Sequence, residues 1–473
     1  MTAPAPPAAP PADSGPHDQR PSFSEKSSFL AGNFGNVLLS TTISSFLLLY
    51  LTDVLGLAAA AVGTLLLVVR VVDSLIDPFV GYAVDHLPET RRGRFRTYLL
   101  VGGVLGGISF AALFLAPALL PAPLAVAWIV YLLWGFAYPT MDIPLNSLLP
   151  VMTSDRSERG KLAAVKGFTY LTGGVIVVAG TLPVVGSFGS ERTGWLIWAT
   201  SLAVVSVVLT AIAALGVRER VRPTRTDRYG VRDLLRIFIG GRPVPVLLTA
   251  KVSTAAASAA MLATMPFYFL YNVGEEGLMS VAALVMMVPM AAGSVIAPVL
   301  ARRFGGKPAY LGGLVVAALG NGAMLFAPYD MVPVIMACLA FAGLGMGTAT
   351  TLNYTLLAEL TDYVEWRHGH RAEGALASLA SFAAKAGGGL GGAATAYCLG
   401  LFGYVARADQ SERALDGIRF AQGGIPLALI VLGGLVFLAY PIDRRVSARI
   451  ADELAVRRAV APVTRPGEGS GRR

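Results

Sequence analysis

Four ionisable side chains lie within long apolar stretches of this sequence. Asp73 and Asp77 share one stretch, Asp142 lies in a second and Lys385 in a third. A charge near the centre of a lipid bilayer costs about 2.5–3.5 kcal/mol on insertion scales, so such residues face a cavity or one another. Carboxylates and an ammonium group in these surroundings are typical of a path for an ion, a proton or a polar solute.

Spacing places two of these acids on one face of a helix. Arg70, Asp73 and Asp77 are separated by three and four residues, which matches the helical period. Facing other helices across a wet cavity, these charges can pair with partners of opposite sign. A static network of ion pairs that holds the helices together is the alternative interpretation.

Two further helix faces carry polar residues. Tyr138, Asp142 and Asn146 recur at four-residue intervals, and Ser381 precedes Lys385 by the same interval. Each set therefore lies along one side of its helix. We expect these faces to meet the one that carries Asp73.

Composition identifies the elements that hold these residues. Of 473 residues, 55% are hydrophobic and 14% are charged, and apolar runs of membrane-spanning length recur along most of the chain. The sequence therefore predicts an all-α integral membrane protein with twelve transmembrane helices. The predicted spans are 28–52, 57–84, 97–117, 122–150, 162–187, 194–217, 243–271, 277–300, 307–328, 331–358, 372–402 and 420–441.

The spans divide into two sets of six. Basic turns that contain glycine follow the second and the eighth span, at Arg91 to Arg94 and at Arg302 to Lys307. Two six-helix bundles around a central cavity are a transporter architecture. The predicted organisation is a disordered tail at 1–24, a first bundle at 25–217, a basic loop at 218–242, a second bundle at 243–441 and a basic, loose tail at 442–473.

The net charge of +9 follows membrane topology rather than a nucleic-acid surface. Arginines gather in alternate loops, above all in the segment 218–242. The positive-inside rule then places both termini in the cytoplasm and the protein in the plasma membrane as a multi-pass chain. Residues 1–24 lack the apolar core of a signal peptide. We expect no nucleic-acid partner.

Other function classes lack their sequence features. Cys338 and Cys398 lie inside apolar spans, and the four histidines lie in tails or loops, so no metal-ligand spacing is present. No nucleophile–base pair indicates an enzyme, and the short tails offer no partner domain for a sensor or scaffold. We expect no cofactor or metal, a monomer, and the bilayer and a small-molecule substrate as partners.

Several motifs in combination identify a family. The chain resembles the glycoside–pentoside–hexuronide:cation symporters of the major facilitator superfamily over roughly residues 25 to 445. The matching segments are Arg70-Val-Val-Asp73-Ser-Leu-Ile-Asp77-Pro78, Tyr138-Pro-Thr-Met-Asp142-Ile-Pro144, Asp362-Tyr-Val-Glu365-Trp366, Lys385-Ala-Gly-Gly-Gly-Leu-Gly-Gly and Tyr50-Leu-Thr-Asp53-Val-Leu-Gly56.

The resemblance implies roles for the membrane-embedded charges. Asp73 and Asp77 match the carboxylates that bind the coupling cation, and Asp142 and Tyr138 match residues that hold the sugar. Lys385 matches a lysine that couples the two sites. We also assign Arg70 to coupling, because it shares a helix face with the cation-binding aspartates.

The resemblance also implies a gate. Arg159, Asp362 and Glu365 match a cytoplasmic gate of ion pairs.

Departures from the family bear on the substrate. An aspartate, a tryptophan and an arginine that contact sugar in the melibiose carrier align with Val37, Asn146 and Gly167. Sugar hydroxyls need convergent hydrogen-bond partners, so these changes weaken a melibiose-like interpretation. The substrate-binding candidates outside the matched motif positions are Asn33, Asn36, Val37 and Asn146.

Departures also bear on the coupling cation. An asparagine and a threonine that accompany sodium binding in the family align with Ile76 and Pro139. A hard cation prefers a cage of about six oxygens, by analogy with other hard ions. Because a proton needs only one carboxylate to accept it, the sequence favours proton over sodium coupling.

Lys166 and Lys251 are two further lysines within apolar spans. Long cationic side chains commonly extend along apolar surface toward water. We therefore expect both ammonium groups to reach toward the ends of their spans.

These patterns together predict a secondary active transporter. It would carry a sugar, glycoside or related small polar solute in symport with a cation, by alternating access. The alternative is an exporter, or a carrier of lysolipids or other amphiphiles, with the same fold. A polar cavity lining favours a sugar, and an apolar crevice open to lipid favours an amphiphile.

Overall fold

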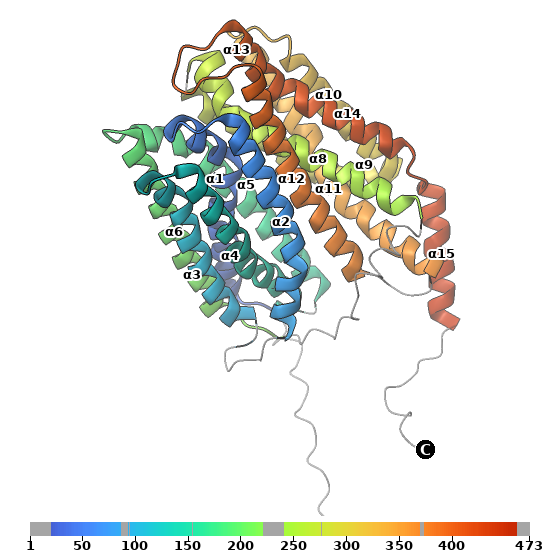
Figure 1. The fold of residues 1–473 in the computed structure, drawn as a ribbon. Coiled ribbons are helices and arrows are strands. Elements are labelled where there is room, and N and C mark those ends of the chain that lie inside the picture. The colour runs from blue at the N-terminus through green and yellow to red at the C-terminus, as the bar shows by residue number, and fades with distance from the viewer. Residues whose placement is uncertain are drawn as a thin grey trace, which may run out of the picture.

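The computed structural model describes residues 20–86, 93, 95–153, 155–220, 241–275, 277–368 and 373–460. These residues fold almost entirely into helices (Figure 1). In chain order the helices of the first half are α1 (Phe23–Leu49), η1 (Tyr50–Val54), α2 (Ala59–His86), α3 (Phe95–Leu119), α4 (Pro123–Met152), α5 (Arg156–Gly186) and α6 (Glu191–Gly216). Those of the second half are α8 (Pro243–Phe267), η2 (Tyr268–Val273), α9 (Gly277–Phe304), α10 (Gly306–Met324), α11 (Val332–His368), α12 (Glu373–Leu401), α13 (Glu412–Arg419), η3 (Phe420–Gly424), α14 (Ile425–Leu438) and α15 (Arg444–Val460).

The helices match the predicted membrane spans. Among the described residues, ten helical stretches are long and apolar enough to cross a membrane. Helices α10 and α12 occupy the two remaining predicted positions. The second of these carries Lys385 and many glycines, and it packs between α2 and α8. Because α12 lies between neighbouring helices, it needs less apolar surface than a lipid-facing span.

The helices form two halves with a limited interface between them. In the first half α1 packs on α5 and α6, and α3 packs on α4 and α6. In the second half α8 packs on α12 and α14, and α11 packs on α9 and α10. The halves meet through α2 with α12, α5 with α9 and α1 with α8. Figure 1 shows the first half in blue to green beside the second in yellow to red.

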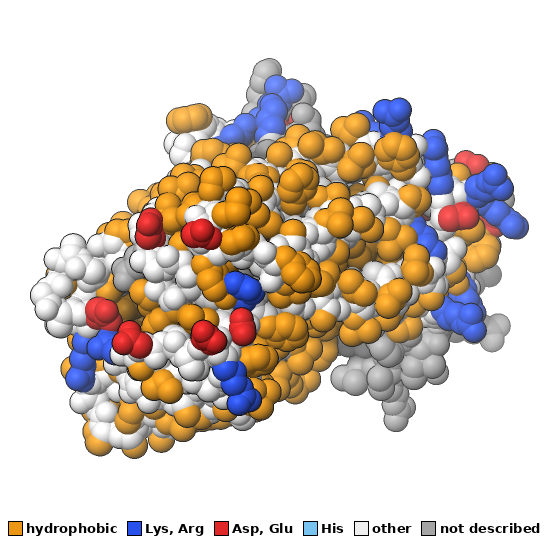
Figure 2. Space-filling model, turned by 90° about the horizontal axis from the view of Figure 1, so that it is seen from above, with side chains coloured by type: hydrophobic (Ala, Val, Ile, Leu, Met, Phe, Trp, Pro, Cys, Tyr) orange, Lys and Arg blue, Asp and Glu red, His pale blue; other side chains and the backbone are white. Residues whose placement is uncertain are grey.

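The two ends of the molecule differ in charge. We call the end that carries Arg96, Arg159, Arg302 and Arg303 the basic end, and the end that carries α13 the opposite end. In the view onto the opposite end, most visible side chains are hydrophobic and the charged ones form small groups (Figure 2). The helices also carry many exposed large hydrophobic side chains, such as those of Ile108, Val208 and Val295, as contact with a bilayer requires.

Near the basic end, two helices extend beyond the predicted elements. Helix α11 continues to His368, past the predicted end of its span at residue 358. The expectation of a loose tail at 442–473 is wrong for Arg444–Val460, which forms α15. This helix packs on α11, and Trp366 Nε1 donates to Glu453 Oε2 at 2.6 Å. Residues 461–473 lie outside the described part of the chain.

Helix α1 begins earlier than the predicted tail boundary allowed. Ser22 caps it: the Ser22 Oγ accepts from the Glu25 amide, and Glu25 Oε2 accepts from the Ser22 amide at 2.7 Å. This reciprocal pair is a capping box. Glu25 also accepts from Arg220 at 2.9 Å, which ties the start of α1 to the segment after α6. Residues 1–19 and 221–240, within the predicted tail and basic loop, lie outside the described residues.

Glycines allow α12 to approach its neighbours. A Cβ atom at Gly391 would lie 2.0 Å from the Ala256 carbonyl oxygen of α8, whereas a Cβ atom at Gly388 would meet nothing within 4 Å. Gly391 therefore allows α12 to pack closely on α8. Gly388, three residues after Lys385, faces open space instead.

This difference predicts opposite effects of one methyl group. Gly391→Ala should lower the free energy of unfolding by about 1–3 kcal/mol, since the added carbon meets backbone that cannot yield easily. Gly388→Ala, its control in the same helix, should leave stability unchanged or raise it by up to about 1 kcal/mol. Thermal unfolding of the purified variants measures both, and equal effects would contradict the packing.

Candidate functional site

An ion pair between the two halves lies at the centre of the site. Lys385 Nζ of α12 is 3.3 Å from Asp73 Oδ1 of α2, and Arg70 Nη1 is 3.7 Å from Asp73 Oδ2. The Asp73 carboxylate, only 3% exposed, therefore faces one cation from each half. The structure thus brings together three of the predicted cation-binding and coupling residues. Asp77 lies one turn further along α2, and its side chain is outside the described part.

Close backbone packing makes this pair possible. A Cβ atom at Gly389 would lie 2.6 Å from the Arg70 Cβ, so α12 can pass α2 only because this residue has no side chain. On the other side, a Cβ atom at Gly135 of α4 would lie 3.6 Å from the Asp73 Cβ. Asp73 is therefore enclosed by helices of both halves.

A second polar cluster joins α1 to α4. Asn36 Nδ2 donates to Asp142 Oδ1 at 3.0 Å, and Tyr138 Oη donates to Asn36 Oδ1 at 3.0 Å. The ring of Trp134 stacks on that of Tyr138, with centroids 4.8 Å apart. Asn36 thus orients both predicted sugar-binding residues, and the aromatic stack fixes the position of the phenol.

Arg70 lies between the two clusters. Its guanidinium group lies close to the rings of Tyr131 and Tyr138 on α4 as well as to Asp73. A change in the charge of Asp73 would therefore reach the substrate cluster through one side chain. This arrangement fits the coupling role predicted for Arg70.

The other substrate candidates take different positions. Asn33 donates to a backbone carbonyl of its own helix at 2.8 Å, and Val37 is buried against α5. Neither joins the cluster around Asp142. Asn146 is exposed and accepts a hydrogen bond from Lys166 Nζ. The Lys166 ammonium group therefore has a partner in α4, whereas the sequence analysis expected it to reach toward the end of its own span.

Exposed side chains at the interface indicate a hollow between the halves. Tyr170 of α5 in the first half lies close to Tyr354 of α11 in the second, and the two residues are 55% and 66% exposed. Asn146 is also exposed, and the position beside Gly388 is open. The interface between the halves is therefore accessible at Asn146, one helical turn from Asp142.

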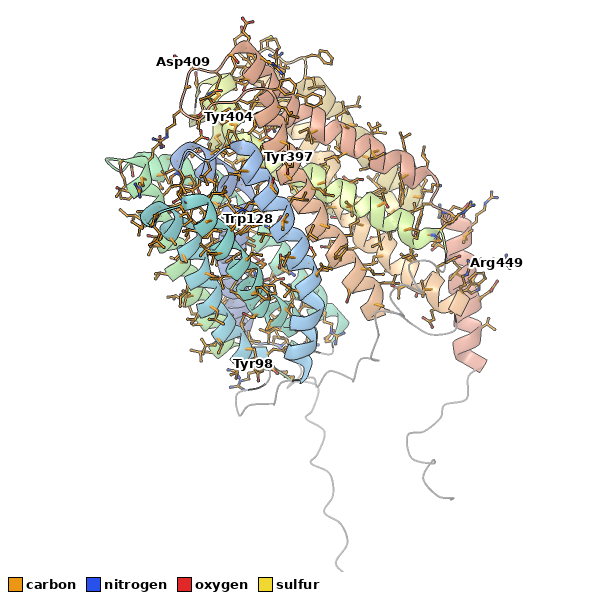
Figure 3. The ribbon with its side chains drawn as sticks, in the orientation of Figure 1. Tyr98, Trp128, Tyr397, Tyr404, Asp409 and Arg449 are labelled. Atoms are coloured by element: carbon orange, nitrogen blue, oxygen red, sulfur yellow. The ribbon has the colours of Figure 1, made fainter. Side chains whose placement is uncertain are left out.

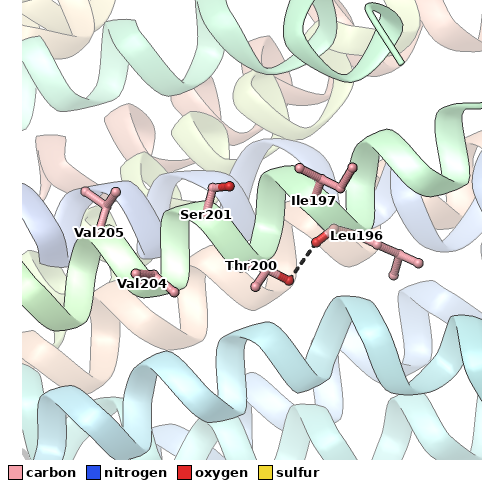
Figure 4. A pocket seen from close by; sticks show the side chains of 6 residues that line it. All are labelled: Leu196, Ile197, Thr200, Ser201, Val204 and Val205. Carbon is pink, nitrogen blue, oxygen red and sulfur yellow. Dashed lines mark hydrogen bonds between the residues drawn. The ribbon is translucent and has the colours of Figure 1, made fainter. Parts of the chain in front are cut away.

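A separate, shallow groove lies on α6. Its lining is mainly apolar, and the Thr200 hydroxyl donates to the Leu196 carbonyl of the same helix at 2.7 Å (Figure 4). None of the predicted site residues lines it. The residues of this groove are Leu196, Ile197, Thr200, Ser201, Val204 and Val205.

Hydrogen bonds between the halves close the opposite end. The buried Asp53 carboxylate, at the end of η1, accepts from Tyr404 Oη at 2.6 Å and from Tyr271 Oη at 2.5 Å. Thr64 of α2 and Tyr397 of α12 share a further hydrogen bond of 2.8 Å. Figure 3 shows Tyr397 and Tyr404 toward this end of the molecule. We call Asp53, Tyr271 and Tyr404 the outer clasp.

An internal repeat places two members of the outer clasp. Tyr50-Leu-Thr-Asp53-Val-Leu-Gly56 and Tyr268-Phe-Leu-Tyr271-Asn-Val-Gly274 each form a π-helical turn that ends at a glycine of positive φ, +70° and +75°. Asp53 and Tyr271 thus stand at matching positions of the two halves. The sequence analysis included the first segment among the family motifs but assigned Asp53 no role. Comparison of the two segments is the signal that could have identified Asp53 as a functional residue.

The residues of the predicted gate lie on α5 and α11, one helix of each half, toward the basic end. Arg159 Nε donates to the Thr153 carbonyl at 2.9 Å within the first half. Asp362 and Glu365 lie on the extension of α11 in the second half. The gate stays a prediction for a conformation closed at this end.

Two helical halves with a charged, accessible interface define a membrane transporter of the major facilitator fold, not an enzyme. A D-xylose–proton symporter of known structure has this fold, with a TM-score of 0.64 at 16% identity over 89% of this chain and 98% of its own. Residues 28–444 match the model of the family described as MFS/sugar transport protein. The chain belongs to this family.

Curated relatives cover nearly the whole chain. The isoprimeverose transporter of Lactiplantibacillus pentosus is 31% identical over 443 residues, which are 92% of each chain. The glucuronide carrier protein homolog of Escherichia coli (strain K12) is 30% identical over 420 residues, 88% of this chain and 92% of that protein. The similarity therefore includes both halves and the interface between them.

Removal of the outer clasp should open the opposite end. Asp53→Asn loses hydrogen bonds to a charged acceptor, each worth about 1.5–3 kcal/mol, so the population open at this end should rise about tenfold or more. Spin labels at Leu119→Cys and Phe326→Cys, exposed residues of the two halves, report the distance between them. Asp409→Asn, at an exposed loop residue, is the control. An unchanged distance distribution in Asp53→Asn would contradict the role of the clasp.

Proposed function

We propose that this protein is a secondary active transporter that moves a sugar or glycoside in symport with a cation. The observation that carries the proposal is the contact between Asp73 and Lys385, one ion pair that spans both halves beside a polar cluster. The relatives support the substrate class, since one is named an isoprimeverose transporter and another a glucuronide carrier homolog.

Cation binding would act on this ion pair. A cation at Asp73 and Asp77 offsets the carboxylate charge, which weakens the hold on Lys385 and on Arg70. Arg70 can then change its contacts with Tyr138, and the substrate engages Tyr138 and Asp142. Binding of both ligands favours the state in which the halves close around them, as alternating access requires.

The surroundings of Asp73 support a proton as the coupling ion. Its two carboxylate oxygens each face a cationic group, at 3.3 and 3.7 Å. A sodium ion would have to displace these cations and gather further oxygens, because hard ions need several ligands. A proton adds to one oxygen and removes the charge that holds both cations.

The polar cavity residues favour a sugar over an amphiphile. Asn36, Tyr138, Asp142, Asn146 and Lys166 offer hydrogen-bond donors and acceptors within the interface. Sugar hydroxyls need such convergent partners, whereas a lysolipid chain needs apolar surface. This lining fits import and export equally, so an exporter of the same solute class is the second candidate.

Charge distribution supports an orientation in the membrane. The arginine-rich basic end would face the cytoplasm, which places both termini there and the outer clasp on the outside of the plasma membrane. The closed clasp then corresponds to a state open to the cytoplasm. We propose that the transporter works as a monomer, since one chain supplies both helical halves and hence a complete interface.

Asp73→Asn should abolish gradient-driven accumulation. The variant keeps a polar side chain but can no longer take up the coupling cation. Accumulation of isoprimeverose or 4-nitrophenyl β-D-glucuronide in proteoliposomes should fall at least tenfold, while exchange of the same solute across the membrane persists. Asp409→Asn should accumulate solute normally, and full accumulation by Asp73→Asn would exclude this residue from coupling.

The coupling ion is testable with the same vesicles. An imposed pH gradient without sodium should drive accumulation of the solute, and an imposed sodium gradient at equal pH should not. Accumulation that requires sodium would contradict proton coupling but would leave symport intact.

A further inference from the structure

Two lysines within the membrane-spanning helices take no part in the proposed coupling. Lys166 belongs to α5 in the first half and Lys251 belongs to α8 in the second. Among the described residues, neither ammonium group lies within 4 Å of a carboxylate. Lys385 and Arg70, by contrast, both contact Asp73. Within the described part of the interface, these two ammonium groups thus have no carboxylate partner.

The contacts of both lysines are uncharged. Lys166 donates to the amide oxygen of Asn146, and Lys251 Nζ lies 5.0 Å from the centre of the Tyr354 ring. An aromatic face attracts a cation, but less strongly than a carboxylate does. The sequence analysis expected Lys251 to extend toward water at the end of its span. Its ammonium group instead points at Tyr354 of another helix. Each ammonium group is thus positioned at the interface by a partner that an anion can replace.

The two lysines border the same hollow. Tyr170 follows Lys166 by one turn on the same face of α5, and it lies close to Tyr354, which contacts Lys251. Both tyrosines are more than half exposed. The two exposed tyrosines therefore connect the two lysines across the interface. From the first half to the second, the residues are Lys166, Tyr170, Tyr354 and Lys251.

The cost of burying charge argues against a passive role. A cation near the bilayer centre costs about 2.5–3.5 kcal/mol on insertion scales, and a paired acid offsets part of that cost. Two such cations in one accessible region create a positive potential that attracts an anion. Asp142, one helical turn from Asn146, is the nearest acid on α4 and would repel an anion placed beside it. The substrate is thereby oriented, with its anionic group toward the lysines.

We propose that Lys166 and Lys251 form a subsite for an anionic group, a carboxylate or a sulfonate, on the transported sugar. This inference rests on the proposed function and names the substrate class of that same site. The sugar hydroxyls bind at Asn36, Tyr138 and Asp142, and the anion binds between the lysines. The separation along α4 between Asp142 and Asn146 is one turn, roughly 5.4 Å, which is comparable with the size of one sugar ring. Because the lysines belong to different halves, the bound anion links the halves.

A matched pair of glycosides tests the subsite. 4-Nitrophenyl β-D-glucuronide and 4-nitrophenyl β-D-glucopyranoside differ only at C6, where a carboxylate replaces a hydroxymethyl group. Calorimetry on the full chain in lipid nanodiscs should give at least tenfold tighter binding of the glucuronide, since a hydrogen bond to a charged group is worth about 1.5–3 kcal/mol. A 6-sulfonated glucoside in the same assay distinguishes sulfonate from carboxylate preference.

Variants assign the preference to the two lysines. Lys166→Gln and Lys251→Gln should each reduce the glucuronide preference, which is the ratio of the two affinities, about tenfold. Lys251→Arg, which keeps the charge, should retain the preference, and so should Arg302→Gln, which removes a cation outside the site. Size-exclusion profiles and unfolding temperatures confirm that each variant is folded.

Three results would overturn the subsite: equal affinity for both glycosides, binding of neither, or a preference that survives both lysine substitutions. These equilibrium measurements use no ion gradient. A failure of symport, seen as solute movement that no gradient drives, is therefore distinct from a failure of anion recognition.

Discussion

The transporter depends on one carboxylate that two cations share across its central interface. Asp73 is almost fully buried, and it contacts Lys385 from the other half and Arg70 from its own helix. Removal of one partner from a buried ion pair typically costs about 3–5 kcal/mol, because an uncompensated charge remains. The approach of α2 and α12 requires Gly389, whose missing side chain leaves room for Arg70. Any ligand that changes the charge of Asp73 therefore changes the free energy of contact between the halves.

The two ends of the molecule differ in the contacts that their side chains make. At one end the outer clasp joins the halves through Asp53 and two tyrosines. At the basic end, Glu25 accepts from Arg220 and Arg159 donates to the Thr153 carbonyl, each pair within the first half. The polar cluster of Asn36 and Asp142 lies between these ends, beside the shared carboxylate. Alternating access then requires only that one set of contacts forms when the other breaks.

Local sequence patterns predicted much of this structure, and their limits have physical causes. Apolar runs located every span, because the bilayer sets helix length. The acids and Lys385 were found because charges in apolar runs are costly. Contacts between distant segments carry no such signal: Asn36 joins Asp142 whereas Asn33, one turn away, bonds its own helix. The contacts of Tyr404 with Asp53, 351 positions apart, and of Lys251 with Tyr354 likewise have no signal in the local sequence. Helix α15 was missed because its stability comes from packing on α11.

A double-mutant cycle on Asp73→Asn and Lys385→Gln tests the shared carboxylate most directly. Denaturant unfolding of the wild type, the two single variants and the double variant gives the four free energies. The account predicts that each single variant is destabilised and that the double variant is more stable than the sum of their effects allows, by at least about 1 kcal/mol. Additive effects, within about 0.5 kcal/mol, would show that the two residues do not interact and would contradict the coupling mechanism.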